Sequence, residues 1–291
     1  MTRSVTVLRS GPLCTIQDEG RPGLADTGVA RSGACDRASF RLANRLVGNP
    51  PDSAVLEVTF GGLRLRADAD VVVVTTGARC ASAQAHNGPV QLRAGQALVL
   101  GAPVAGLRSY VALRGGIDVP PVLGSRSTDL LSGLGPAQIR DGDVLQLGDS
   151  CRLMPGVDIA PVAEPAHAAV TVSVTPGPRW DWFTDRAQAA LLGTTYTMTS
   201  DSNRIGLRLH GQALQRSGPG ELPSEGIVRG AIQVPPSGQP VLFLADHPVT
   251  GGYPIIAYVD DDDVDLCAQL RPGQSLSMQA AASRPLVKGS P

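Results

Sequence analysis

Glycine and proline interrupt this sequence so often that it leaves room for short strands but hardly for long helices. The chain contains 34 glycines and 24 prolines. Between them lie short apolar runs that are rich in β-branched residues: SVTVL, AVLEVTF, VVVVTTG, SYVALRGG, VTVSVTP, PVLFLAD and IIAYVD. Runs of this length, bounded by turn-forming residues, are typical of strands. Because few helical segments separate them, we predict a mainly β fold, a barrel or sandwich, rather than a Rossmann-type sheet.

Three segments have the pattern of short helices. Residues 36–49 begin with Asp36 as a candidate N-cap, continue with an apolar stripe and end at Gly48. We expect two further helices at residues 180–193 and about 262–270. The acidic run from Asp260 to Asp263 lacks the spacing of a calcium loop, so we interpret it as a solvated helix start.

A short motif, R-x-G-[QD]-x-L, occurs three times, at residues 93–98, 140–145 and 271–276. Its glycine favours a turn and its apolar residues favour a following strand, so we interpret each copy as a strand-entry turn. The first and third copies fall at similar places in two β-rich halves. We therefore predict domains at residues 1–155 and 170–291, joined by a segment rich in proline and alanine, although the division in space need not follow chain order.

The overall charge excludes one class of partner. The formal net charge is −1, so the chain has no basic excess with which to neutralise a phosphate backbone, and we expect no nucleic-acid binding. The N-terminus has no long apolar run, so we expect neither a signal peptide nor a membrane anchor. Five widely spaced cysteines without a C-x-x-C pair fit a reducing compartment, and we predict a cytoplasmic location.

Several familiar catalytic motifs are missing from the sequence. It has no G-x-x-x-x-G-K-[ST] loop, no G-x-S-x-G elbow and no histidine pair at metal-ligand spacing, so we expect no metal site. His247 stands alone in a polar, glycine-rich segment. It is expected to be a structural or surface histidine rather than an acid–base group.

Two polar loops in the first half are candidates for binding a small ligand. Gln17, Asp18 and Arg21 lie within a loop rich in glycine and proline, where arginine suits a planar carboxylate. The alternative is a self-satisfied turn in which Asp18 caps the loop and pairs with Arg21. The second loop, residues 32–36, leads into the first predicted helix, whose free N–H groups favour an anion unless Asp36 caps them.

Two more polar loops lie in the second half. Residues 200–206 place Asp201 and Arg204 just before a strand. Residues 245–254 carry hydroxyl groups beside a Gly-Gly pair, at which backbone can approach a ligand closely: Thr250, Gly251, Gly252 and Tyr253. The alternative for this last loop is a tight hairpin turn.

Seven stretches, read in order, resemble one protein family: VLRSGPLCTIQDEGRPG, SGACDRASFRLANRLVGNP, LEVTFGG, RSYVALRGGIDVPPVLGSRST, SDSNRIGLRLHG, SEGIVRGAIQVPPSGQPVLFLAD and TGGYPIIA. The family is the KipA-like or 5-oxoprolinase C-subunit family, also labelled biotin-dependent carboxyltransferase or allophanate hydrolase subunit 2. The likeness covers nearly the whole chain. It departs from the family at Cys35, commonly Met, at Val249, commonly Thr, at Ile255, often Lys, and at the Ser202-Asn203 pair.

The resemblance implies a pair of cyclophilin-like β-barrels and an obligate partner, the KipI-like B subunit of the enzyme, together with its A subunit. The implied reaction is the ATP-driven hydrolysis of the lactam 5-oxo-L-proline to L-glutamate, with Mg²⁺ as a possible companion of ATP. The chain is then expected to be inactive alone. Two alternatives remain open: carboxyl transfer to urea or a related small amide with biotin on another chain, and a non-catalytic regulator that binds the KipI-like protein.

The matching positions supply the candidate site residues. As catalytic groups we expect Arg21 or Arg204 to clamp a carboxylate or phosphate, and Asp18 and Asp201 to orient an amide N–H or a magnesium ion. The Gly251-Gly252 N–H groups would meet developing oxyanion charge. The remaining expected residues are Tyr253 in the catalytic set and, for substrate binding, Gln17, Asp36, Gln233 and Thr250.

Overall fold

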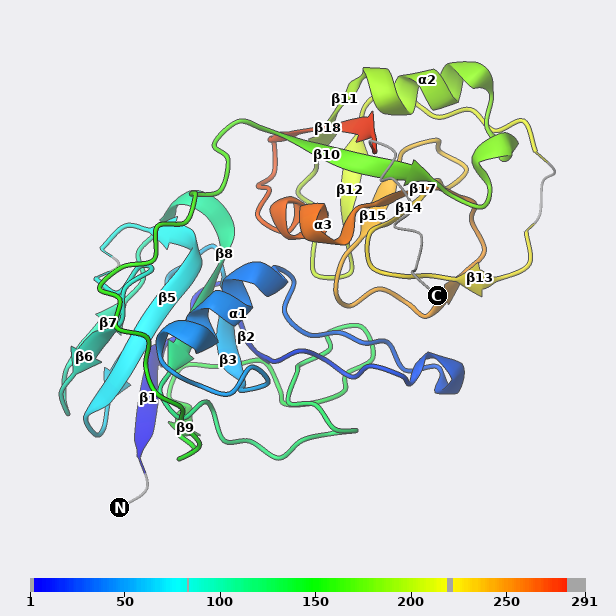
Figure 1. Ribbon diagram of the computed structural model, residues 1–291. Helices are drawn as coiled ribbons and strands as arrows, with labels where there is room; N and C mark the ends of the chain where they lie inside the picture. Colours follow the sequence, from blue (N-terminus) through cyan, green and yellow to red (C-terminus); the bar gives the residue numbers. More distant parts are fainter. Residues whose placement is uncertain (1–2, 83, 219–221, 282–291) are drawn as a thin grey trace, which may run out of the picture.

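The computed structural model describes residues 3–82, 84–218 and 222–281, and it confirms the prediction of a mainly β fold (Figure 1). The first half contains two antiparallel sheets. One has four strands, in the order β7 (Ala97–Val99), β4 (Arg64–Ala67), β1 (Ser4–Arg9) and β9 (Val144–Gln146). The other has five, in the order β2 (Leu13–Gln17), β3 (Val55–Thr59), β8 (Pro103–Leu113), β5 (Val71–Cys80) and β6 (Val90–Leu92).

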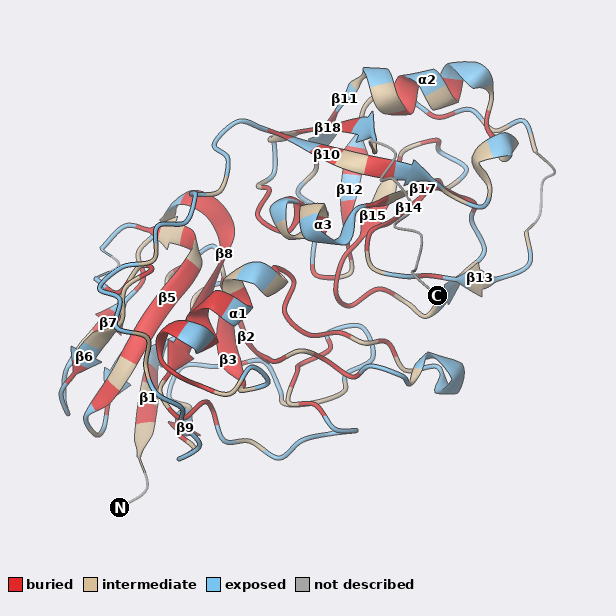
Figure 2. Ribbon diagram, in the orientation of Figure 1, coloured by how far each residue is buried: buried red, intermediate tan, exposed pale blue. Residues whose placement is uncertain are grey.

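The alternation of apolar residues along these strands builds a core between the two sheets. Val5 and Val7 of β1 meet Val58 of β3 and Val111 of β8 in one buried cluster. The other face of the five-stranded sheet is covered by α1 (Arg37–Leu46), which packs Phe40 against it in a second cluster. Figure 2 shows buried residues along most of β5 and β8 and at alternating positions of α1. The first half is therefore layered as sheet, sheet and helix.

The second half is a closed barrel of seven strands. Their order is β10 (Ala169–Pro176), β17 (Ile255–Val259), β14 (Ala231–Gln233), β15 (Val241–Phe243), β12 (Gly206–His210), β11 (Thr195–Met198) and β18 (Ser275–Ala280). β10 and β18 pair in parallel, and the other neighbours are antiparallel. A separate pair joins β13 (Glu225–Gly226) to β16 (Thr250–Gly251). Closure satisfies the backbone groups that an open sheet would leave at its edges.

The predicted helices all form, with small shifts at their ends. Besides α1, they are α2 (Asp185–Gly193) and α3 (Asp261–Cys267). Residues 180–182 were expected to open the second helix but form a separate 3-10 turn, η2 (Trp180–Trp182). The N-cap of α2 is Thr184, whose side chain accepts a hydrogen bond from Ala187 N–H. Another 3-10 turn, η1 (Ala25–Thr27), lies in the loop before α1.

All three copies of the R-x-G-[QD]-x-L motif are strand-entry turns, as predicted. They lead into β7, β9 and β18, and their glycines have left-handed φ angles of 85°, 92° and 87°. In each copy the Gln or Asp side chain accepts a hydrogen bond from the backbone N–H of the motif's arginine, at 2.8, 2.8 and 2.7 Å. The repeated contact explains why Gln and Asp interchange at that position, since either can supply an acceptor oxygen. No helix within the described ranges is long and apolar enough to cross a bilayer.

Candidate functional site

A buried ion cluster joins the two halves. Arg204, which is 1% exposed, bonds Asp246 through Nε and Nη2, both at 2.9 Å, and contacts Glu57 from the first half through Nη1. Arg108 lies 3.7 Å from Glu57. Burial opposes the charge of Glu57, but Arg204 and Arg108 outweigh it and hold the pKa of this carboxyl below its usual range. All the hydrogen-bonding nitrogens of Arg204 are engaged, since Nη2 also donates to Gly33 O, so this arginine supports the site instead of clamping a ligand.

The side chains of Gln17, Asp18 and Arg21 are likewise held by hydrogen bonds, most of them to residues 122–128. Asp18 accepts hydrogen bonds from Gly20 N, Arg126 N and the hydroxyls of Ser125 and Ser127, at 2.5 to 2.8 Å. Gln17 is fully buried and donates to Thr128 O at 2.9 Å. Arg21 does not pair with Asp18, as the self-satisfied turn would require; it donates to the carbonyls of Val122 and Ser127. Its Nη1 has no hydrogen-bond partner among the residues that the structure describes.

Asp36 and Asp201 occupy ordinary positions. Asp36 caps α1 by accepting the Ser39 N–H at 2.9 Å, so the helix N-terminus is already filled. Gln269 donates to the same carboxylate at 2.7 Å, while burial and the charge of Asp265 raise the pKa of Asp36 to about 6. Asp201 is exposed in the turn after β11. Neither Asp36 nor Asp201 therefore shares a ligand-binding position with Arg21.

The Gly-Gly loop is not a hairpin, because its β16 pairs with β13, more than twenty residues earlier. A Cβ on Gly251 would come within 2.6 Å of Ile227 and 2.8 Å of Gln233, so close packing requires glycine there. Gln233 donates to Tyr253 O at 2.9 Å, which fixes the bend through Gly252. Tyr253 is half-exposed, and its ring lies 5.7 Å from the Arg216 guanidinium carbon.

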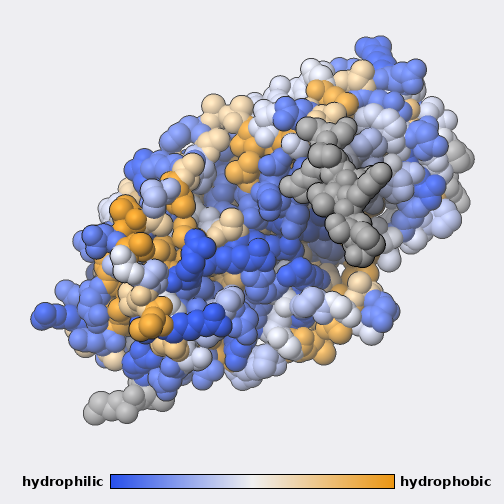
Figure 3. Space-filling model, in the orientation of Figure 1, coloured by the Kyte–Doolittle hydropathy of each residue, from blue (hydrophilic) through white to orange (hydrophobic). Residues whose placement is uncertain are grey.

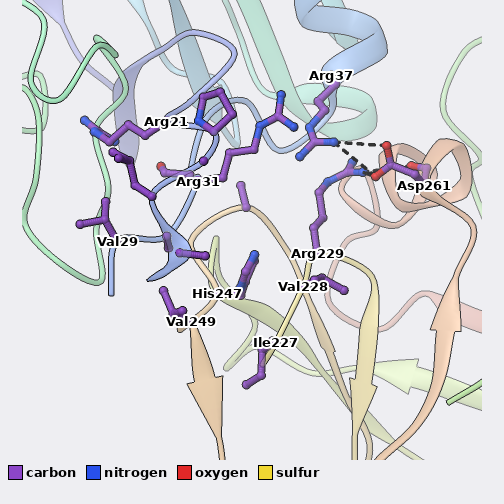
Figure 4. A pocket seen from close by; sticks show the side chains of 17 residues that line it. Arg21, Val29, Arg31, Arg37, Ile227, Val228, Arg229, His247, Val249 and Asp261 are labelled. Atoms are coloured by element: carbon purple, nitrogen blue, oxygen red, sulfur yellow. Dashed lines mark hydrogen bonds and ion pairs between the residues drawn. The ribbon is translucent and has the colours of Figure 1, made fainter. Parts of the chain in front are cut away.

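A pocket of about 360 Å³ lies where the two halves meet. The first half contributes the loop that runs from Arg21 to Arg37, and the second contributes residues 227–229, 245–249 and Asp261. Figure 4 shows these side chains around the cavity. In Figure 3, which has the orientation of Figure 1, hydrophilic side chains gather across the middle of the molecule. Among the predicted site residues, only Arg21 lines this pocket.

The polar wall of the pocket is cationic. Four arginines line it, Arg21, Arg31, Arg37 and Arg229, together with the carboxylate of Asp261. Two carboxylates behind the lining also form ion pairs, Glu19 with Arg31 at 3.6 Å and Asp265 with Arg229 at 2.5 Å. Figure 4 shows Arg31, Arg37 and Arg229 turned toward one side of the cavity, whereas the Arg21 guanidinium extends away from them. Burial and the nearby charges of Arg229 and Arg31 lower the pKa of Arg37 to about 10.

Asp261 bridges two of these arginines. Its carboxylate lies 3.2 Å from Arg37 Nη1 and 2.5 Å from Arg229 Nη1, although the side chain itself is 69% exposed. Burial raises the pKa of Asp261, but Arg229 and Arg37 outweigh it and lower that pKa. Arg31, Arg37 and Arg229 are called the arginine seat below. Two of its guanidinium groups already hold the Asp261 carboxylate, so the seat can bind a planar anion.

His247 stands in the same pocket, although the sequence pattern favoured a structural or surface histidine. Its Nδ1 lies 2.9 Å from Pro248 O, and a carbonyl only accepts, so Nδ1 carries the hydrogen and the neutral ring leaves Nε2 bare. Burial lowers the pKa of His247, which keeps the ring neutral at pH 7. Asp246, its neighbour, is held by Arg204 and accepts the hydroxyl of Ser32 at 2.7 Å. The buried ion cluster therefore anchors the pocket wall that carries His247.

Sequence reasoning missed Arg31, Arg37, Arg229 and Asp261. Each stands beside residues whose pattern had a structural explanation: Arg37 follows a helix cap, and Asp261 lies in the acidic run interpreted as a solvated helix start. That interpretation of the run is confirmed, since α3 begins at Asp261. An available signal was that nearly all basic residues are arginine, the side chain that suits bidentate anion binding.

Comparison with known proteins places the whole chain in context. A family model described as "Carboxyltransferase domain, subdomain A and B" matches residues 27–280. The C subunit of 5-oxoprolinase from Escherichia coli (strain K12) is 38% identical over 278 residues, which cover 93% of this chain and 89% of that protein.

Solved structures show the same fold within longer chains. The crystal structure of TTHA0988 superposes with a TM-score of 0.86 at 33% identity, covering 96% of this chain but 56% of that one. The K. lactis urea amidolyase superposes with a TM-score of 0.87 at 29% identity, covering 97% of this chain and 19% of that one. The chain thus spans only part of the solved proteins that it matches.

Proposed function

Because this chain belongs to the carboxyltransferase-domain family and is related there to 5-oxoprolinase C subunits, we propose that it is the C subunit of an ATP-dependent 5-oxoprolinase. In this proposal it works with the KipI-like B subunit of the enzyme, together with its A subunit, hydrolyses 5-oxo-L-proline to L-glutamate, and is inactive without them. The family expected from the sequence motifs is confirmed by these comparisons.

One observation carries the choice of substrate: the cationic seat made by Arg31, Arg37 and Arg229. 5-Oxoproline has a carboxylate that a pair of guanidinium groups can hold as they hold Asp261. Urea is neutral and has no carboxylate of its own for two guanidinium groups to hold. The pocket volume of about 360 Å³ accommodates a five-membered lactam with space for a reacting group beside it.

Within this proposal the arginines position the substrate and His247 serves as proton acceptor. A lactam is resonance-stabilised, and phosphorylation of its oxygen makes the carbonyl carbon open to attack by water. Transfer of the phosphoryl group from ATP to the lactam oxygen, with ADP as the leaving group, releases the amide N–H proton, for which the bare Nε2 of His247 is a suitable acceptor; the same histidine can return a proton to the nitrogen when water opens the ring. Val29, Ile227 and Val249 provide apolar walls that limit water around the reacting bond.

ATP and Mg²⁺ enter the proposal as contributions shared with the partner chains. No group of three His, Cys, Asp or Glu side chains suited to a metal is found within the described part of the chain. Mg²⁺ is usually held by one or two carboxylates together with nucleotide phosphates, so in this proposal it arrives with ATP. Biotin belongs only to the alternative reaction below.

The alternative is a carboxyltransferase subunit that acts on urea or a related small amide, with biotin on another chain. The likeness to the K. lactis urea amidolyase favours it. In that reaction too an amide nitrogen must lose a proton, so His247 would keep its role, whereas the arginine seat would serve the carboxyl group being transferred.

The test begins by purifying the chain with its KipI-like partner and the A subunit of the enzyme. Turnover is then measured in two separate reactions, one with ATP and 5-oxo-L-proline and the other with urea and carboxybiotin. Arg37→Gln should raise the KM for 5-oxoproline strongly, because it removes one side of the carboxylate seat. Arg208→Gln, a change of the same type at an exposed position on β12, is the control. The proposal would be contradicted by turnover with urea and carboxybiotin but none with 5-oxoproline. An unchanged KM for 5-oxoproline in Arg37→Gln would also contradict it.

A further inference from the structure

A second surface feature of the first half has no part in the pocket between the halves. A groove of about 620 Å³ lies between the end of β1, the turn after β3, and β4 and β7. Its exposed apolar side chains are Leu8, Phe60 and Val99, each 39 to 42% exposed. Arg9 and Arg64 are its only charged lining residues. Figure 1 places β1 and β7 on the side of the first half that faces away from the barrel.

Phe60 is held in a conformation that a bulky residue avoids. Its φ angle is 63°, and the next two residues, Gly61 and Gly62, also have left-handed φ angles. The turn is packed backbone to backbone, since a Cβ on Gly61 would lie 2.1 Å from Gly101 O and one on Gly11 would lie 2.3 Å from Gly61 O. A positive φ is an outlier for a bulky residue and costs strain, yet Phe60 is also 42% exposed, so burial of its ring does not offset that cost fully.

The neighbouring strand β1 is irregular at the same place. Its pairing with β4 shifts between Val7 and Arg9, so Leu8 lies in a bulge and faces outward together with Arg9. Bulges of this kind re-aim side chains and are found near functional surfaces. Two independent backbone irregularities thus present apolar side chains on one groove.

The charges on the groove are also unbalanced. Arg9 lies directly opposite Arg64 across the β1–β4 pair, an arrangement that destabilises a sheet. Neither forms an ion pair within the part of the chain that the structure describes. Asp141 is near enough for Arg9 to contribute to its lowered pKa, yet Asp141 bonds Ser10 instead. An acidic group from another molecule would relieve this repulsion.

We propose that this groove is a docking surface for a partner polypeptide that inserts an apolar side chain against Phe60 and places carboxylates against Arg9 and Arg64. Aromatic residues, phenylalanine among them, and arginine are enriched in the cores of protein interfaces. The partner is a different chain rather than a second copy, because two copies meeting at this groove would bring four arginines together without an acidic lining residue. The proposal rests on the proposed function only for the choice of proteins with which it is tested.

The test compares the stability of the free chain with its affinity for two proteins, the KipI-like partner and the A subunit of the proposed enzyme. Phe60→Gly should keep or raise the melting temperature of the free chain, because glycine adopts left-handed angles without strain. The same change should weaken binding of one partner by about 30-fold or more, as loss of an interface anchor does. Arg64→Glu should also raise the melting temperature, by pairing with Arg9, and weaken binding most at low salt.

Leu123→Gly is the matched control, since Leu123 is also exposed, apolar and left-handed, at φ 51°. It should raise the melting temperature and leave partner binding unchanged. The proposal is overturned if Phe60→Gly lowers the melting temperature, if it binds both partners as the wild type does, or if neither partner binds the wild type. A dimer of the free chain that Phe60→Gly dissociates, seen by light scattering, would also overturn it. Complex formation that depends on Phe60, without ATP turnover on 5-oxoproline, would contradict the proposed function only.

Discussion

Replacing Arg204 by methionine should lower the free energy of unfolding and weaken the cooperativity with which the two halves unfold. Methionine fills a similar volume without charge, and it leaves Glu57 and Asp246, both buried, without their shared cation. Removing one partner of a buried ion pair costs roughly 3–5 kcal/mol. Glu57 keeps Tyr110 Oη and Cys35 N, and Asp246 keeps the hydroxyl of Ser32, so we expect a loss of about 4 kcal/mol rather than more.

The control is Arg79→Met, which breaks the half-exposed Arg79–Glu164 pair of 2.6 Å. Exposed pairs contribute about 0–1 kcal/mol, so this variant should remain close to wild type. Urea unfolding measures both, followed by far-UV circular dichroism and by tryptophan fluorescence. Both tryptophans, at positions 180 and 182, lie in the second half, so fluorescence reports on that half alone.

In wild type the two signals should change together, and in Arg204→Met fluorescence and dichroism should give different midpoints. If Arg204→Met lost less than about 1 kcal/mol, as expected of an exposed pair, the ion cluster would not be what joins the halves. Coincident transitions in that variant would lead to the same conclusion.

Three further predictions concern the pocket and its surroundings. Asp261→Asn removes the resident carboxylate between Arg37 and Arg229, so carboxylates such as 5-oxoproline should bind about fivefold more tightly by calorimetry; unchanged or weaker binding would show that Asp261 does not compete for the seat. His247→Gln in the assembled enzyme should lower kcat by about 10²–10⁴ with little change in KM and remove the acidic limb of the pH profile; His210→Gln, at an exposed position on β12, is the control. The folded-state pKa of Asp36 is raised to about 6 from 3.8, so its stabilising contribution is present below about pH 4 and is lost as pH rises to 6. Asp36→Asn keeps the helix cap, so its stability difference from wild type should change over that interval, and a constant difference in denaturation at pH 4 and 7 would refute this assignment.

The site was only partly predictable, and the reason differs between residues. Asp36 was recognised as a helix cap because capping involves residues three positions apart. Arg21 and Arg204 were singled out as ligand clamps, but a sequence does not reveal that Asp246 and Glu57, which are distant along the chain, engage Arg204 completely. His247 shows the reverse case: its pattern was that of an unremarkable histidine, and only the fold places it in the pocket between the halves.

The amino-acid sequence by itself determined the features that depend on neighbouring residues: short strands between glycines and prolines, three helices and the recurring turn that introduces β7, β9 and β18. These follow from local backbone preferences and from hydrogen bonds that span a few positions. The tertiary structure alone decided where charge gathers. Arg31 and Arg37 come from one half and Arg229 and Asp261 from the other, and they meet because contacts between the halves, the buried Arg204 cluster and the Gln269–Asp36 hydrogen bond among them, hold the halves together. Long-range electrostatics of this kind depends on distances in space, which spacing along the chain does not specify.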